Sequence, residues 1–113
     1  MTHGSITIER DGNKYSIETS INVQVKKKTR NWVVYSPDFN TLGYSPNSQE
    51  DALAEFKKAL RVFFHIQLKR NSLDRYLINH RWSKIDHRFE SPERFKWPEF
   101  TPVPVTEEFE FAN

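Results

Sequence analysis

The sequence has no cysteine, only three glycines and no long apolar run. The absence of cysteine excludes a disulfide framework and a thiolate metal site. The glycines do not have the spacing of a phosphate-binding loop. No apolar segment approaches the roughly 20 residues that cross a bilayer, and no basic segment followed by an apolar one marks a signal peptide. We therefore expect a soluble, cytoplasmic protein without a membrane partner.

The chain of 113 residues has the length of one domain with a modest core. Its formal net charge of +2 conceals an uneven distribution. Residues 1–89 hold 15 Lys or Arg against 9 Asp or Glu, whereas residues 90–113 hold 2 against 6. The basic part can therefore contact either an acidic partner or the acidic C-terminal segment of its own chain.

Residues 48–70 predict one long amphipathic helix around which the chain is organised. Ser48 is a suitable N-cap, because its hydroxyl can accept a hydrogen bond from a backbone N–H of the first turn, and Asp51 completes an approximate capping box. Acidic residues near the start and basic residues in the middle and end suit the helix dipole. The apolar positions recur at intervals of three and four and predict one broad buried face. They are Ala52, Leu53, Phe56, Ala59, Leu60, Phe63, Phe64 and Ile66.

Two alternating segments near the start of the chain predict a β-hairpin. Residues 5–9 and 14–18 alternate between polar and apolar side chains, which is typical of strands that are buried on one face. Asp11-Gly12 lies between them and is a turn signal, because glycine adopts a positive φ without steric cost.

Residues 21–27 and 32–36 predict a second pair of strands, and residues 41–45 can add a short further one. Pro37 ends the second strand of the pair because proline cannot donate to a ladder. The long helix needs a surface that covers its apolar face. We therefore predict an α+β fold with a small antiparallel sheet of three to four strands, the N-terminal hairpin added, one long helix across one face and a short second helix.

The short second helix is expected over residues 72–80, with Ser72 as its cap. Trp82 and Ile85 are expected to close the end of the core. We assign residues 1–87 to the α+β domain. Residues 88–113 form an acidic extension, rich in proline and aromatic residues, that can end in a strand.

No arrangement of residues supports an enzyme, a metal site or a cofactor. None of the four histidines forms a pair with ligand spacing. Glu9, Glu18 and Asp38 could in principle converge as acid, base or metal ligands. Two of them lie at solvent-facing strand positions, however, which favours an ordinary surface role. We therefore predict a protein that is not an enzyme.

A basic segment beside aromatic residues raises a nucleic-acid-binding hypothesis. Such side chains can bind phosphates and stack on the bases of single strands. The alternative is a solvated turn whose charges discourage edge-to-edge aggregation. The residues concerned are Lys26, Lys27, Lys28, Arg30, Trp32 and Tyr35.

Several features of residues 32–82 follow one another in the order found in a known family. A strand ends at a Pro-Asp pair, a capping serine precedes an acidic-Ala pair that opens the long helix, and a shorter helix leads to a tryptophan. The matching residues are Pro37, Asp38, Ser48, Asp51, Ala52, Leu73, Leu77 and Trp82. In this order the chain resembles the HicB-like antitoxin domains, and the likeness extends through residues 21–28 as the first strand of the family.

The resemblance implies a partial ribonuclease-H-like fold without nuclease residues. It also implies a domain that binds and blocks a small basic HicA-like toxin, which cleaves messenger RNA. Arg81 and Pro46 stand where the family has glycine, and the hairpin of residues 5–18 lies outside the family pattern. No DNA-binding segment of the kind found in complete members is recognised.

The acidic aromatic end of the chain is the predicted partner-binding segment. Its carboxylates would steer the encounter with a basic toxin, and its phenylalanines would anchor the complex by burial. Alternatively, this segment is the last strand of its own sheet. Exposed edge strands also favour a homo-oligomer. The predicted partner-binding residues are Glu107, Glu108, Phe109, Glu110 and Phe111.

Overall fold

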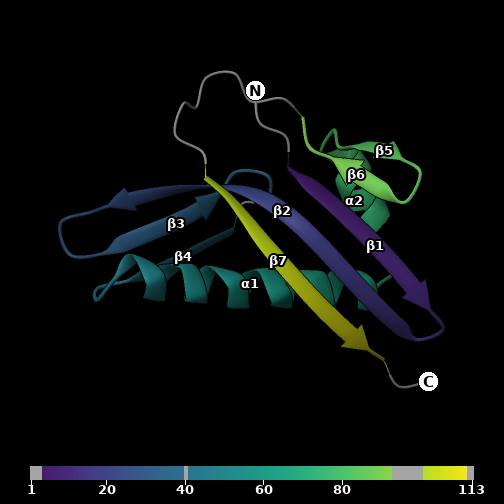
Figure 1. The fold of residues 1–113 in the computed structure, drawn as a ribbon, viewed down its shortest axis with the longest axis horizontal. Coiled ribbons are helices and arrows are strands. Elements are labelled where there is room, and N and C mark those ends of the chain that lie inside the picture. Colours follow the sequence, from purple (N-terminus) through teal and green to yellow (C-terminus); the bar gives the residue numbers. More distant parts are fainter. Residues whose placement is uncertain (1–3, 40, 93–100, 112–113) are drawn as a thin grey trace.

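The computed structural model describes residues 4–39, 41–92 and 101–111, and these form an α+β fold in which an antiparallel sheet packs against a long helix (Figure 1). The strands are β1 (Ser5–Asp11), β2 (Lys14–Lys27), β3 (Trp32–Ser36), β4 (Thr41–Ser45), β5 (Ser83–Ile85), β6 (Arg88–Glu90) and β7 (Thr101–Glu110). The helices are α1 (Gln49–Lys69) and α2 (Leu73–Asn79). The predicted fold class is confirmed, but three to four strands are too few for the seven that the described residues contain. None of these helices is long and apolar enough to cross a membrane.

β2 lies at the centre of the sheet. The strand order is β4-β3-β2-β1-β6-β5, and β7 also pairs with β2. Residues 14–20 of β2 pair with β1 on one edge and with β7 on the other. The final residues of β2, 24–27, pair with β3. Strands from both ends of the chain therefore meet at β2 (Figure 1).

β2 is continuous, whereas the apolar pattern predicts two shorter strands over residues 14–18 and 21–27. Thr19 explains the difference, because it occupies a buried position in the same row as Ile17 and Ile21. Its hydroxyl donates a hydrogen bond to the Val105 carbonyl at 3.1 Å. A polar residue therefore interrupts the apolar pattern without interrupting the strand.

The predicted N-terminal hairpin is confirmed. Asp11 pairs with Lys14, which leaves a two-residue turn of Gly12 and Asn13. Gly12 has a φ of 62°, in the left-handed region that glycine adopts without steric cost. The Asn13 side chain also donates a hydrogen bond to the Phe111 carbonyl, so the turn contacts the end of β7.

The predicted N-cap of the long helix is also confirmed. The Ser48 hydroxyl accepts a hydrogen bond from the Asp51 N–H at 3.0 Å. The buried side chains of α1 follow a spacing of four and comprise Ala52, Phe56, Leu60, Phe64 and Leu68. Ile66 lies off this row and is exposed, so its predicted place on the buried face is wrong.

Aromatic residues close the end of the core near α2. The Phe39 ring lies 5.2 Å from the Phe63 ring and 5.6 Å from the Trp82 ring, measured between centroids. Trp82 is buried as predicted, but Ile85 lies on β5 and its side chain is 52% exposed, so that prediction is wrong. Ser72 lies at the N-cap position of α2 as predicted, but its hydroxyl does not cap the helix and instead donates to the Gln67 side-chain oxygen at 2.6 Å.

α1 approaches β4 so closely that only glycine fits at position 43. A Cβ atom on Gly43 would lie 2.2 Å from the Phe56 nitrogen and 2.5 Å from the Ala52 carbonyl oxygen. Both are backbone atoms of a helix, and they cannot turn aside as a flexible side chain could. The packing of the helix on the sheet therefore depends on this residue.

We predict that Gly43→Ala lowers the free energy of unfolding by about 3 kcal/mol, because the added methyl group overpacks the contact between α1 and β4. Gly12→Ala is the control, since open space surrounds that position and only its positive φ opposes alanine, at a cost of about 1–2 kcal/mol. Chemical denaturation of the two variants measures the difference. A Gly43→Ala protein as stable as the wild type would contradict the predicted close packing.

Candidate functional site

The face of the sheet that points away from α1 is polar. Along β2 and β7 the odd-numbered residues Ile17, Val105 and Phe109 are buried against the helix layer. Successive side chains of a strand point to opposite faces, so the even-numbered residues of these strands lie on the outer face. In β1 the register places the odd-numbered residues there.

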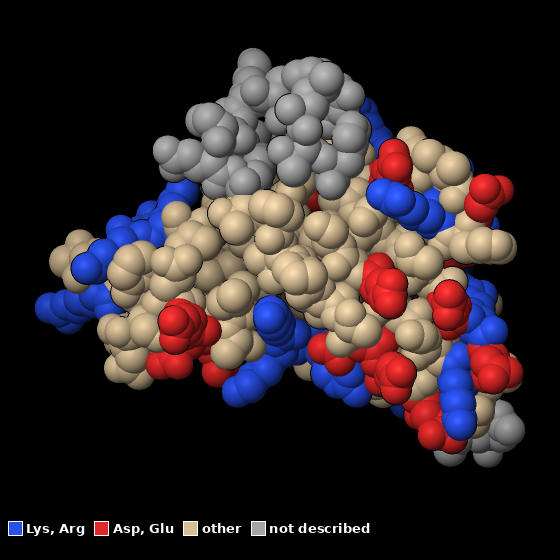
Figure 2. Space-filling view, in the orientation of Figure 1, with Lys and Arg blue, Asp and Glu red and all other residues tan. Residues whose placement is uncertain are grey.

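Carboxylates occupy neighbouring rows of this outer face. We call the group of Glu9, Asp11, Glu18, Glu108 and Glu110 the acidic face. Figure 2 shows carboxylates over the end of the sheet where β1, β2 and β7 lie side by side. All five side chains belong to exposed residues.

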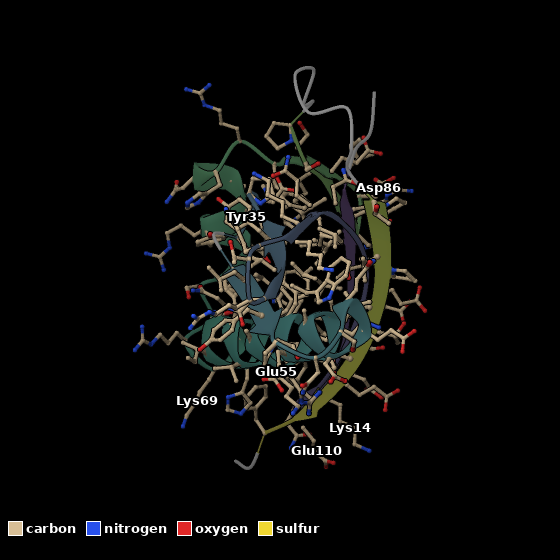
Figure 3. The ribbon with its side chains drawn as sticks, turned by 90° about the vertical axis from the view of Figure 1, so that its left-hand side faces the viewer. Lys14, Tyr35, Glu55, Lys69, Asp86 and Glu110 are labelled. Atoms are coloured by element: carbon tan, nitrogen blue, oxygen red, sulfur yellow. The ribbon has the colours of Figure 1, made fainter. Side chains whose placement is uncertain are left out.

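The register of the strands fixes how the acidic face is arranged. Ser16 on β2 lies directly between Glu9 on β1 and Glu108 on β7. In the next row, Lys14 lies between Asp11 and Glu110, and Figure 3 shows Lys14 and Glu110 at the same end of the molecule. Residues directly opposite one another have Cβ atoms about 4.5–5.5 Å apart.

The acidic face keeps a net negative charge within the described part of the chain, because five carboxylates share it with Lys14. None of its five carboxylates makes an ion pair there, and Lys14 is the cation that shares its central rows. A hollow of about 640 Å³ lies at this end of the sheet. Its lining includes Glu9, Ser16 and Glu108 together with the cations Arg10 and Lys14. The arrangement offers carboxylate and hydroxyl acceptors to a cationic ligand.

Arg61 joins α1 to β7 on the opposite side of the sheet from the acidic face. Its guanidinium forms an ion pair with Glu107 and donates to the Glu108 carbonyl at 3.3 Å. The same group lies 4.6 Å from the centroid of the Phe109 ring. The basic part of the chain therefore contacts the acidic C-terminal segment here. This contact is one of the two alternatives that the charge distribution predicts.

The structure divides the predicted partner-binding segment between two faces. Phe109 is 5% exposed in the core, and Phe111 is half-buried in an edge-to-face contact with Tyr15 at 5.6 Å. Glu107 belongs to the ion pair with Arg61. Glu108 and Glu110 alone among these residues direct their side chains to the acidic face. Of the two expectations for this segment, a strand of its own sheet is the one observed, since β7 pairs with β2 along its whole length.

The domain boundary placed between residues 87 and 88 falls within one sheet. β6 pairs with β1, and β7 pairs with β2, so strands from both sides of the boundary interleave. Sequence reasoning missed Glu9 and Glu18 as neighbours of Glu108. Strand alternation places each of these residues on a face, but only the pairing of β1 and β7 with β2 brings them together.

The predicted nucleic-acid-binding residues do not form one surface. Lys26, Lys27, Lys28 and Arg30 are exposed around the turn between β2 and β3, and the Lys27 ammonium lies 5.2 Å from the centroid of the Trp32 ring. Trp32 and Tyr35 are three positions apart on β3, so their side chains point to opposite faces. Bases stacked on one ring therefore cannot continue onto the other.

The three carboxylates considered for acid–base or metal chemistry are not brought together. Glu9 and Glu18 lie on the acidic face, whereas Asp38 is buried near Tyr76 at the other side of the sheet. Among the described residues, no group of three or more His, Asp or Glu has a geometry that could hold a metal ion. Burial, together with the negative charge of Asp38, raises the pKa of the Tyr76 hydroxyl above its ordinary value.

No family model, curated protein or solved structure matches this chain.

We predict that removal of residues 88–113 abolishes cooperative thermal unfolding. The truncation removes β6 and β7, and with them the burial of Val103, Val105 and Phe109. At about 1.5–3 kcal/mol for each buried side chain, the loss is comparable to the whole stability of a small domain. Circular dichroism on heating measures it. A truncated chain that melts like the wild type would show that β7 is dispensable.

We predict that Tyr76 makes the protein less stable at alkaline pH. Because its pKa is raised in the folded state, the unfolded chain loses this proton first, so the stability contribution is complete below about pH 10 and is lost as pH rises through the folded-state pKa. Melting temperatures between pH 9 and 11 should fall more steeply for the wild type than for Tyr76→Phe. Equal slopes in the two proteins would rule out this linkage.

Proposed function

We propose that this protein is a non-enzymatic protein-binding domain that docks a basic partner on its acidic face. The observation that carries the proposal is the set of five carboxylates on neighbouring strands, with one lysine among them. Glu9 and Asp11 lie two positions apart on one face of β1, as do Glu108 and Glu110 on β7. Their like charges repel one another, and a cationic partner relieves that repulsion on binding.

The position of the acidic face suits rapid association. Complementary surface charge steers a partner during diffusional encounter and raises the association rate. The backbone under these side chains is held by β1, β2 and β7, so the partner does not have to order a free segment of chain. Affinity is therefore not reduced by the entropy of folding on binding.

The resemblance of residues 32–82 to HicB-like antitoxins suggests the class of the partner. In that reading the chain neutralises a small basic HicA-like toxin that cleaves messenger RNA. The contact would be made by Glu108 and Glu110 together with Glu9, Asp11 and Glu18. Phe109 and Phe111 would support it from the core side by holding β7 against β2.

The nucleic-acid-binding alternative receives less support from the structure. Its cationic residues are exposed, but Trp32 and Tyr35 face opposite sides of the sheet. Protein binding on the acidic face is therefore the function that we propose.

We predict that the double variant Glu9→Gln/Glu108→Gln binds the basic partner about tenfold more weakly, because two exposed charge contacts of about 0.7 kcal/mol each are lost. Affinity capture from the source cell with the full chain, followed by mass spectrometry, identifies the partner. Titration of the purified partner at two salt concentrations then measures the affinity.

Glu50→Gln/Asp86→Asn is the matched control. It removes the same charge from two exposed positions outside the acidic face, at the start of α1 and between β5 and β6, so its binding should equal that of the wild type. Equal binding by Glu9→Gln/Glu108→Gln and the wild type would exclude the acidic face as the site. Capture that disappears after nuclease treatment would favour the nucleic-acid alternative instead.

A further inference from the structure

β4 is an outer strand whose free edge carries backbone donors and acceptors. The Lys28 N–H donates to the Asn31 carbonyl at 2.7 Å, which makes this pair the first hydrogen-bonded pair of the β2–β3 ladder. Hydrogen-bonded and non-hydrogen-bonded pairs alternate along an antiparallel ladder. The backbone of Val34 therefore points toward β4, where it meets Gly43.

The same alternation turns the backbone of Leu42 and Tyr44 outward. Their partners on β3, Tyr35 and Val33, direct their own N–H and C=O groups toward β2. Leu42 and Tyr44 consequently present two N–H and two C=O groups along the outer edge of β4. Such an edge is a template on which another strand can pair.

The outer edges of β7 and β5 are protected. The Phe111 N–H donates to the Asn13 carbonyl at 3.0 Å, so alternation directs the backbone of Pro102 and Pro104 to the outer edge of β7, where proline has no N–H to donate. Arg61 already donates to the Glu108 carbonyl on that edge. β5 is only three residues long and carries Lys84, and short, charged edge strands resist pairing.

Uncharged side chains predominate beside the edge of β4, and the two charged residues there have opposite signs. Leu42 is 51% exposed and Tyr44 is 61% exposed. With Val62 of α1 they line a groove of about 480 Å³. Glu55 and Lys58 border the same groove and pair with each other at 3.2 Å, so their charges cancel.

We propose that the edge of β4 pairs with β4 of a second copy of this chain, in an antiparallel register that places Gly43 opposite Gly43. This register overlaps all five residues of the strand and sets Leu42 of each copy opposite Tyr44 of the other. These outward-facing residues form two hydrogen-bonded pairs and exchange four backbone hydrogen bonds across a two-fold axis.

Self-pairing suits this edge better than it suits the other surfaces. Two acidic faces, or two turns at residues 26–30, would bring like charges together, whereas the β4 edge brings together apolar side chains and a groove without net charge. β4 also lies at the far side of the sheet from the acidic face, so a dimer leaves that face open (Figure 1).

Sedimentation of the full chain over a range of concentrations tests the proposal. The wild type should be a dimer, and Leu42→Lys should raise the dimer dissociation constant at least about tenfold, which corresponds to about 1.4 kcal/mol. Ile78→Lys is the matched control, since Ile78 is 55% exposed on α2, and it should sediment like the wild type. A monomeric wild type, or a Leu42→Lys dimer as tight as the wild type, would overturn the proposal without affecting the proposed function.

Engineered cysteines test the register, because the chain has no cysteine of its own. In the proposed pairing, residue 42 of one copy and residue 44 of the other have Cα atoms about 5.5 Å apart, within the range of a disulfide. An oxidised mixture of Leu42→Cys and Tyr44→Cys proteins should therefore form a cross-linked dimer. Each variant alone places its cysteines diagonally, about 8 Å apart, and should stay uncross-linked. Equal cross-linking of the single variants and the mixture would overturn this register.

Discussion

The pairing of β2 with β1 on one edge and β7 on the other holds the molecule together. β3 and β4 continue the sheet from the end of β2, and α1 packs chiefly on these two strands. Ile17 is fully buried between Ile8 of β1 and Glu107 of β7, which come from opposite ends of the chain, and Ile21 is fully buried beside Val103 of β7. An isolated pair of strands could not bury them in this way.

This arrangement separates two kinds of surface on β7. One row of its side chains enters the core and anchors the strand, and the other row presents carboxylates outward. The charge that distinguishes the C-terminal segment therefore serves two purposes: Glu107 fixes the strand to α1 through Arg61, while Glu108 and Glu110 extend the acidic face. Because the inward row of side chains anchors β7 in the core, its outward row can bind a partner without disturbing the packing of the strand.

Local features of the sequence predict much of the fold. Gly12 gives the hairpin turn, Ser48 gives the start of α1, and the spacing of Phe56, Leu60 and Phe64 gives its buried side. Thr19 conceals the continuity of β2, because a buried threonine resembles a break in an apolar row. The acidic end of the chain is expected to be a strand only as one of two alternatives. Pro102 and Pro104 obscure the start of β7, because proline fits a strand only where its backbone points to an outer edge.

The candidate site was harder to predict than the fold. Alternation shows that Glu9, Glu18 and Glu108 lie on solvent-facing positions of their own strands. It does not show which strands are neighbours, and Glu9 and Glu108 lie in one row only because β1 and β7 both pair with β2 at Ser16. A single sequence contains no local signal for a pairing between its first strands and its last.

The long separation between β2 and β7 has a consequence for biosynthesis. Lys14 pairs with Glu110, so the second edge of β2 remains empty until almost all of the chain described here has left the ribosome. Contacts so distant along the chain form slowly, and an unfilled central strand is prone to pair with the wrong neighbour in the meantime. The nascent chain is therefore expected to be a substrate for chaperones that shield exposed strands.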